Sequence, residues 1–328
     1  MDKNLEKLEQ EVNELVAKLQ SLKQEVHKVV VGQEEVMNQL IIGMLSGGHV
    51  LLEGLPGLAK TLMIKSLAKA LSLDFNRIQF TPDLMPTDIL GTEVIEQDEN
   101  GHKSFKYIQG PVFTNVLLAD EINRTPPKTQ AALLEVMQEY KVTYAGKDYR
   151  MDRPFFMLAT QNPLEQSGTF PLPEAQVDRF LLYVKIGYPS EQEEEDILKL
   201  TTGKLKAEIK PVLKAEEIIR LQELVREVFI SDDLIKSISK LVRSTRPNTS
   251  EVQAVKDYVD FGAGPRAGQA MIMAAKAHAL MNGRFSVTPE DIKMILFPAL
   301  RHRILLNFKA ESEKKTTDDL LTPFLKDL

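Results

Sequence analysis

The chain has 328 residues, which predicts about two domains of roughly 150 residues each. It contains no cysteine, which excludes disulfides, thiolate nucleophiles and cysteine-based zinc sites and favours a reducing compartment, the cytoplasm. Its 41 basic and 47 acidic residues give a formal charge of −6, which disfavours nucleic acid as a general ligand. The longest apolar run, Leu40 to Leu52, is interrupted by polar residues and is too short to span a membrane.

A heptad pattern begins the chain, with charged and amide residues between the apolar positions. The apolar positions are Leu5, Leu8, Val12, Leu15, Leu19, Leu22, Val26 and Val29. Spacings that alternate between three and four place these side chains on one seam of a helix. We therefore expect an N-terminal extension over 1–28. It either packs on its own domain as an amphipathic helix or pairs with another chain as a coiled coil.

Beyond Gly32, short apolar segments alternate with helical ones, as is typical of a parallel sheet covered on both faces. The expected strands are Val50–Leu52, Phe75–Phe80, Val116–Ala119, Phe155–Ala159 and Phe180–Ile186, and the expected helices include Lys60–Leu71 and Lys128–Tyr140. A Pro- and Gly-punctuated insert, Thr81–Pro111, follows the second strand, and a hairpin is expected over Val142–Met151. The pattern predicts an α/β domain over 29–189.

Helical patterns replace the strands from about Ser190. The segment Ser190–Glu193 is typical of a capping box that opens a helix, and Pro265 is placed to begin another. A third helix start is indicated at Thr288-Pro289-Glu290-Asp291. We expect a smaller, all-α domain over 190–328.

The first expected strand runs into a turn-rich loop and then a helix, the order of a phosphate-binding P-loop. The loop reads Gly54-Leu55-Pro56-Gly57-Leu58-Ala59-Lys60-Thr61. Its glycines let backbone N–H groups converge on phosphate oxygens, and the helix start adds free donors. Lys60 can reach the β- and γ-phosphates, and Thr61 can place its hydroxyl on Mg²⁺. Ala59 stands where the usual pattern has Gly; Ala is the smallest alternative, so close backbone approach is kept if φ stays negative there. A purely structural strand-turn-helix is the alternative.

Polar residues end two further apolar segments. Asp120 and Glu121 follow Val116–Ala119, and carboxylates at that end of a parallel strand lie where α/β sheets keep their sites. Asp120 would hold Mg²⁺, and Glu121 would act as the general base on the attacking water. Asn162 follows the next strand and could bind the γ-phosphate or that water. Solvated strand ends and an Asn-Pro turn are the plain alternatives.

Together these motifs resemble the AAA+ ATPases, and closely the MoxR family, from Val29 onward. The resemblance is carried by Val30-Val31-Gly32-Gln33, the loop from Gly54 to Thr61, Ala119-Asp120-Glu121-Ile122-Asn123-Arg124, Ala159-Thr160-Gln161-Asn162-Pro163, Leu172-Pro173-Glu174-Ala175-Gln176-Val177-Asp178-Arg179-Phe180 and Gly264-Pro265-Arg266-Ala267. It implies a P-loop AAA+ fold, a parallel five-stranded sheet flanked by helices and followed by a helical lid. The Ala at position 59 of the loop resembles the MoxR family, which usually has Ala there.

The resemblance also implies residue roles. Asn162 matches the sensor-1 position, Arg266 matches sensor 2 and would bridge the lid to the γ-phosphate, and Arg179 matches an arginine finger that acts on ATP of the neighbouring subunit. Arg124 either sits at the subunit seam or is merely exposed. The implied nucleotide-binding set is Val31, Gly32, Gln33, Gly54, Leu55, Pro56, Gly57, Leu58, Ala59, Lys60, Thr61 and Leu62.

The implied function is Mg²⁺-dependent ATP hydrolysis coupled to chaperone-like remodelling or activation of a protein partner. The family implies a ring, typically hexameric, and a partner that often carries a von Willebrand factor A domain. It also places partner-facing loops in the insert over 81–111 and in the hairpin over 142–151. Two alternatives stay open: a nucleic-acid-stimulated motor of the helix-2-insert clade, and a scaffold that binds ATP with little turnover.

Overall fold

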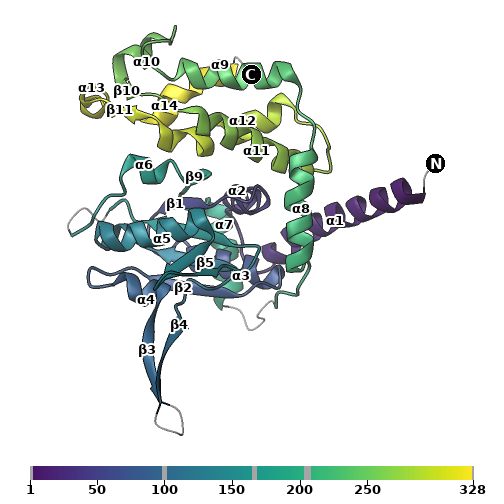
Figure 1. The fold of residues 1–328 in the computed structure, drawn as a ribbon. Coiled ribbons are helices and arrows are strands. Elements are labelled where there is room, and N and C mark those ends of the chain that lie inside the picture. Colours follow the sequence, from purple (N-terminus) through teal and green to yellow (C-terminus); the bar gives the residue numbers. More distant parts are fainter. Residues whose placement is uncertain (1–2, 98–101, 165–167, 203–207, 327–328) are drawn as a thin grey trace.

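The computed structural model describes residues 3–97, 102–164, 168–202 and 208–326, with side chains from Gln10 onward. Its centre is a five-stranded sheet in the order β2-β5-β8-β1-β9, and every neighbouring pair of strands is parallel (Figure 1). The strands are β1 (Val50–Gly54), β2 (Phe75–Gln79), β5 (Val116–Asp120), β8 (Phe156–Gln161) and β9 (Leu182–Ile186). The predicted parallel α/β sheet is confirmed.

Helices cover both faces of the sheet, which is why the central strands are continuous apolar runs. Alternate side chains of β1 point to opposite faces. Leu52 packs in the cluster that contains α2 (Glu34–Leu45) and α3 (Lys60–Ala70), whereas Leu51 packs in the cluster that contains α5 (Pro127–Glu139). All five residues of β5 are buried, so its C-terminal Asp120 ends inside the molecule.

The predicted insert contains the short helix α4 (Pro86–Leu90) and an antiparallel hairpin, β3 (Gly91–Gln97) with β4 (Lys103–Gln109). The hairpin projects from the body as an arm (Figure 1). Its base depends on Gly91, where φ is +109° and a Cβ would lie 2.2 Å from the carbonyl oxygen of Ile108. The cross-strand pair Ile95 and Phe105 leaves large apolar side chains exposed on the arm.

The second predicted hairpin forms from β6 (Lys141–Tyr144) and β7 (Lys147–Arg150). Its two turn residues, Ala145 and Gly146, both have positive φ, as the mirror-image turn of a tight hairpin requires.

Helix α1 (Lys3–His27) packs on its own chain from Val12 onward. Its buried seam residues are Val12, Leu15, Leu19, Leu22 and Val26. Lys18 forms an ion pair with Glu217 at 2.6 Å, and the Gln20 amide donates to the Met281 carbonyl at 2.7 Å. Over these residues the structure favours the intrachain alternative for the heptad. The side chains of Leu5 and Leu8 lie outside the described residues.

The C-terminal part of the chain is helical. Its elements are α7 (Glu191–Thr202), α8 (Ala215–Glu227), α9 (Asp232–Ser244), α10 (Gln253–Tyr258), β10 (Val259–Phe261), α11 (Pro265–Met281), α12 (Pro289–Leu300), β11 (Leu305–Leu306), α13 (Phe308–Ser312) and α14 (Thr317–Leu321). Within the described residues, no helix is both long and apolar enough to cross a membrane.

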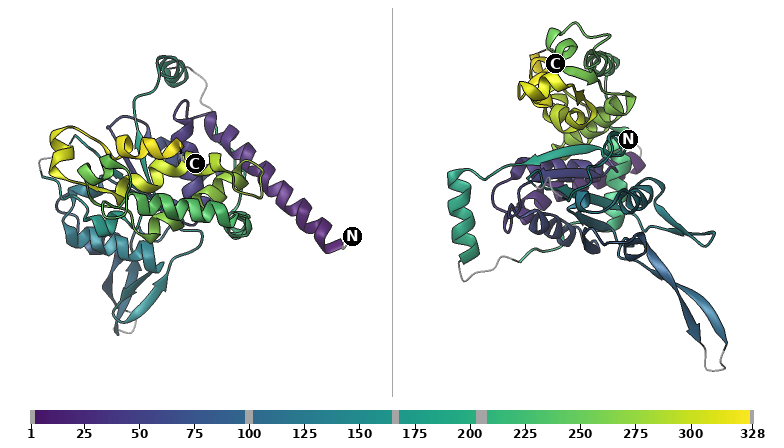
Figure 2. Two further views of the ribbon diagram at one scale, coloured as in Figure 1. Left: turned by 90° about the horizontal axis from the view of Figure 1, so that it is seen from above. Right: turned by 90° about the vertical axis from the view of Figure 1, so that its left-hand side faces the viewer.

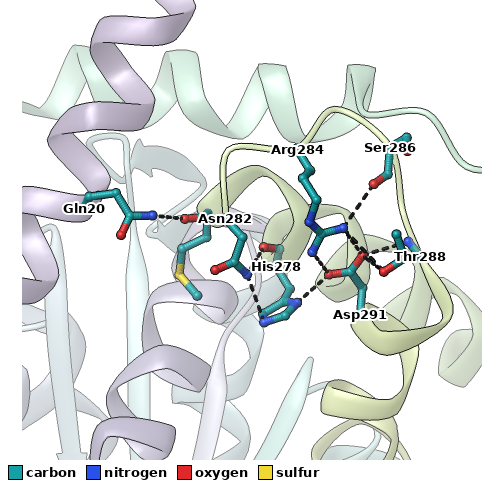
Figure 3. A network of polar contacts seen from close by, with 8 residues as sticks. Gln20, His278, Asn282, Arg284, Ser286, Thr288 and Asp291 are labelled. Carbon is teal, nitrogen blue, oxygen red and sulfur yellow. Dashed lines mark hydrogen bonds and ion pairs between the residues drawn. The ribbon is translucent and has the colours of Figure 1, made fainter.

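A buried carboxylate fastens the two central lid helices together (Figure 3). Asp291 accepts two hydrogen bonds from the Arg284 guanidinium, at 2.7 and 2.5 Å, and one from His278 Nδ1 at 2.6 Å. It also accepts from the backbone N–H of Thr288 at 2.7 Å, which caps α12. These donors hold the pKa of Asp291 well below its usual range despite the opposing effect of burial. The lid therefore has a defined core geometry of its own.

Candidate active site

The loop between β1 and α3 has the backbone that a phosphate-binding loop needs. Gly57 has φ +84°, and the space around the position of its absent Cβ is open, so the backbone there is accessible. Ala59 has φ 56° and ψ 21°, so the condition of a negative φ is not met and the alanine adopts the left-handed conformation that Gly would take more easily. The chain must turn at Ala59 so that its carbonyl can accept from the Met63 N–H at 2.9 Å and start α3. A left-handed conformation costs an Ala roughly 1–2 kcal/mol, a strain that Gly would not carry.

Lys60 begins α3, and its ammonium turns back onto the loop. Its Nζ donates to the carbonyl of Gly54 at 2.7 Å. Thr61 follows, half-buried, in the first turn of the helix. Lys60 is therefore held at the mouth of the loop, within reach of the backbone that would cradle phosphate oxygens.

A cavity of about 390 Å³ opens beside the loop. It is lined by predicted nucleotide-binding residues, namely Val31, Gln33, Gly57, Leu58, Ala59 and Leu62. The far wall comes from residues that no sequence motif had indicated, including Tyr188, Pro189, Ile197, Leu198 and Thr201. Gly32 instead lines a neighbouring cavity of about 300 Å³ between α1 and α2. Apart from Glu194 and Thr201, the residues of the far wall of the first cavity are apolar or aromatic, which suits a purine base.

The cavity is closed by contacts between the segment around Gln33 and the start of α7. The Gln33 side chain donates to the Gly187 carbonyl at 2.9 Å. Glu193 accepts from the Ser190 N–H at 2.7 Å and from its hydroxyl at 2.8 Å, and these bonds lower the pKa of Glu193. The predicted capping box is therefore present. Gly32 is required here, because φ is +73° and a Cβ would lie 3.0 Å from the Glu193 carboxyl carbon.

The two acidic residues at the end of β5, Asp120 and Glu121, are both held by hydrogen bonds. Asp120 accepts from the Thr160 hydroxyl at 2.6 Å through Oδ1, and from Arg77 Nη2 at 2.7 Å through Oδ2. The Thr160 oxygen in turn accepts from the Glu121 backbone N–H at 2.9 Å. Thr160, on β8, therefore ties the two acidic residues into one fixed unit.

The Glu121 side chain is held by two donors. Gln79 Nε2 lies 2.6 Å and Arg124 Nη1 lies 2.8 Å from the same carboxylate oxygen, Oε2. Arg124 thus contacts Glu121 of its own chain. No sequence motif had indicated a role for Gln79, Arg77 or Thr160. The available signal was that Arg77 and Gln79 alternate on a strand expected to belong to the same sheet.

Asn162 is buried at the end of β8 and lines a separate cavity of about 450 Å³. Its Oδ1 accepts from the Leu164 N–H at 3.1 Å. Glu53, the residue before Gly54, and Asn123, two residues after Glu121, line the same cavity. Asn162 therefore lies at the sheet edge that carries the phosphate loop and the two carboxylates.

Arg179 and Arg266 lie together at a different corner of the chain. Arg179 is exposed just after α6 (Glu174–Val177), and Arg266, in the first turn of α11, is 3.5 Å from the Asp178 carboxylate. The buried Arg303 holds the other oxygen of Asp178 at 2.8 Å. Neither Arg179 nor Arg266 is among the described residues that line the cavity at the phosphate loop. The structure does not bring Arg266 to the loop of its own chain.

Residues 49–182 match the family described as ATPase family associated with various cellular activities (AAA), and residues 252–324 match the AAA lid domain. The chain is 43% identical over 303 residues to Chaperone MoxR1 of Mycobacterium tuberculosis, covering 92% of this chain and 79% of that protein. The chain belongs to the MoxR family of AAA ATPases.

Two further comparisons support the MoxR assignment. The chain is 29% identical over 299 residues to Protein MoxR of Methylorubrum extorquens, covering 86% of each. The crystal structure of a candidate ATPase from Cytophaga hutchinsonii superposes with a TM-score of 0.92 at 42% identity, covering 100% of this chain and 99% of that one. The predicted family, fold and enzyme class are confirmed: this MoxR-family chain is an ATPase with a helical lid.

Proposed function

We propose that this MoxR-family ATPase hydrolyses Mg²⁺-bound ATP in a site completed by a second copy, and uses the cycle to remodel a protein partner. The proposal rests chiefly on the separation of Arg179 and Arg266 from the phosphate loop of their own chain. Hydrolysis needs cations that stabilise the transferring phosphoryl group. Within one copy of the chain, Arg179 and Arg266 do not reach the nucleotide site and so cannot serve there. Assembly would therefore control turnover.

The residues at the loop fit the triphosphate. The first N–H groups of α3, a helix of 11 residues, are donors of the kind that bind phosphate, and the space around the absent Cβ of Gly57 is open. Lys60 would exchange the Gly54 carbonyl for phosphate oxygens. Thr61 and Asp120 supply oxygens of the kind that Mg²⁺ prefers. When bound, Mg²⁺ would neutralise charge on the β- and γ-phosphates.

The chain's own groups would then carry out the hydrolysis. Glu121 would accept the proton of the attacking water, and Asn162 would orient that water. Arg179 of one copy would stabilise the transferring phosphoryl group in the next. A contribution of that kind is worth about 10³–10⁵ in rate, which corresponds to roughly 4–7 kcal/mol. Arg266, which lies beside Asp178, would act with Arg179 on the neighbour's nucleotide.

Remodelling of a protein partner is the output that the comparisons favour, because a relative with 43% identity is named a chaperone. The β3–β4 arm exposes Ile95 and Phe105 and offers a contact surface of the right kind. We further propose a hexameric ring and a partner with a von Willebrand factor A domain, both on the family resemblance alone.

Substitution of Glu121 by Gln tests the hydrolytic role. We expect ATP binding within about twofold of the unaltered protein and a loss of about 10²–10⁴ in phosphate release, the range for a general base. Glu96→Gln, on the exposed arm, is the matched control and should leave phosphate release unchanged. Unchanged release in Glu121→Gln would refute the assignment of the base.

The two alternatives give different results with the unaltered protein. A nucleic-acid motor would show ATPase activity stimulated severalfold by single- or double-stranded DNA or by RNA. An ATP-gated scaffold would bind ATP but release phosphate no faster than the Glu121→Gln variant. We expect neither result.

A further inference from the structure

A groove of about 440 Å³ lies between α6 and the β10–β11 pair. Its lid wall includes Phe261 and Leu305, which are Cα partners across the two short strands. The Phe261 side chain is 71% exposed, and Phe308, where α13 begins, is 82% exposed. Large apolar side chains this exposed on neighbouring elements are typical of a contact surface.

The floor of this groove is continuous with the corner that carries the two arginines. Ala175 and Asp178 belong to its wall. Asp178 precedes Arg179 and contacts Arg266. Asp178 therefore places the groove next to both arginines.

A second unpartnered surface lies beside the nucleotide cavity. All residues of α7 are described, and none of them is buried. In both views of Figure 2, α7 stands at the edge of the molecule. Leu198 is 57% exposed and Tyr188, just before the helix, is 76% exposed. A helix of 12 residues with no buried side chain gains little stability within its own chain and needs other contacts.

The charges of the two surfaces are complementary. The exposed face of α7 carries Glu191, Glu194 and Glu195, against one exposed cation, Lys199, which pairs with Glu195 at 3.3 Å. At the groove, the lining residue Asp178 is followed by the exposed cation Arg179 and contacted by the exposed cation Arg266. The acidic residues that line the groove are Glu174, which is exposed, and Asp178, which is paired with Arg303 and Arg266, and the exposed Asp260 stands next to Phe261 on β10. Opposite charges of this kind favour association in one orientation.

We propose that this groove receives the Tyr188–α7 segment of a second copy of the chain, and so delivers Arg179 to that copy's nucleotide. The inference rests on the proposed function, because a shared ATPase site is the reason for choosing a second copy of the chain as the molecule bound in the groove. The contact uses different surfaces on the two copies, so it can propagate around a closed ring. It would also cover α7, which forms a wall of the nucleotide cavity.

Two variants, each altered on one surface, test the contact. Phe261→Glu alters the groove, and Glu191→Lys with Glu195→Lys alters α7 at positions that do not line the nucleotide cavity. Phe229→Glu, on a large apolar side chain 63% exposed between α8 and α9, is the control. Self-association is measured by sedimentation with a non-hydrolysable ATP analogue, ATPase activity by phosphate release, and nucleotide binding with a fluorescent ATP analogue.

We expect each surface variant to sediment as a smaller species and to lose at least about tenfold in ATPase activity, with nucleotide binding and the control variant unchanged. An equimolar mixture of the two should recover activity, because the intact groove of one fits the intact α7 of the other. Unchanged association of either variant, or a mixture as inactive as its components, would overturn the proposal. If the unaltered protein associates through these surfaces but hydrolyses no ATP, the proposed function fails and the contact stands.

Discussion

Gln79 and Glu121 lie at the ends of neighbouring strands, and the Gln79 amide donates to the Glu121 carboxylate at 2.6 Å. The same oxygen accepts from Arg124 at 2.8 Å. The proposed base therefore reaches its position through two donors of its own chain. Since neither donor lines the nucleotide cavity among the described residues, their effect should fall on the chemical step.

Replacing Gln79 by Leu should lower kcat for ATP by about tenfold and leave KM within about twofold. The isosteric Gln79→Glu places a like charge beside Glu121 and should lower kcat further. Steady-state phosphate release over a range of ATP concentrations separates the two constants. Gln97→Leu, at the exposed end of β3, is the control. A rise in KM with an unchanged kcat would contradict a positioning role for Gln79.

Thr160 connects the two acidic residues, since its hydroxyl donates to Asp120 and accepts from the Glu121 N–H. Thr160→Val keeps the shape but leaves a buried carboxylate oxygen and a backbone N–H without this partner. The expected loss in the free energy of unfolding is about 1–3 kcal/mol, measured by urea denaturation. Thr143→Val removes a hydroxyl bond to Asp148 on an exposed hairpin and should cost under about 0.5 kcal/mol. Equal losses in the two variants would argue against a special role for Thr160.

Local sequence patterns were sufficient for the phosphate loop and for the strand ends. Gly54 to Thr61 lies between an apolar run and a helical one, and the structure has β1 and α3 at those places. Asp120, Glu121 and Asn162 end two apolar runs, and parallel pairing of β5 with β8 brings those ends together. In each case the information lies within about ten residues of the position concerned.

The remaining features of the site depend on tertiary packing, which no local sequence pattern predicts. Arg77 and Gln79 reach Asp120 and Glu121 only because β2 pairs with β5, which depends on the strand order. Leu198 lines the nucleotide cavity because the contact between Glu193 and Gln33 fixes the position of the start of α7. Arg266 lies at Asp178 because the lid is anchored there through Arg303.

The positive φ of Ala59 predicts a stabilising substitution. Ala59→Gly removes the left-handed strain, and after the entropy of the unfolded chain is counted it should raise the free energy of unfolding by about 0.5–1 kcal/mol. Ala131→Gly, on the exposed side of α5, should lower it by about 1 kcal/mol. The two variants differ in sign because only Ala59 sits at positive φ. Urea denaturation without nucleotide measures both, and a loss of stability in Ala59→Gly would show that the strain is absent.

His49, the residue before β1, makes the stability of the sheet depend on pH. It is buried, its Nδ1 accepts from the Met157 N–H at 3.0 Å, and its Nε2 lies 3.0 Å from the Met137 carbonyl oxygen. A neutral ring with its proton on Nε2 satisfies both contacts. Burial lowers the pKa of His49 to about 4, against the ordinary value of 6.5. The unfolded chain therefore binds a proton over a pH range in which the folded chain does not.

The contribution of His49 to stability is present in full above about pH 6.5 and is lost as the pH falls toward 4, by about 3 kcal/mol in total. In His49→Asn, Oδ1 replaces Nδ1 as the acceptor and cannot be protonated in this range. Its free energy of unfolding should fall less between pH 7.5 and pH 4.5 than that of the unaltered protein, by about 2–3 kcal/mol. The exposed His27→Asn is the control and should keep the original slope. Urea denaturation at both pH values measures the difference, and equal slopes in His49→Asn and the unaltered protein would mean that another group causes the acid sensitivity.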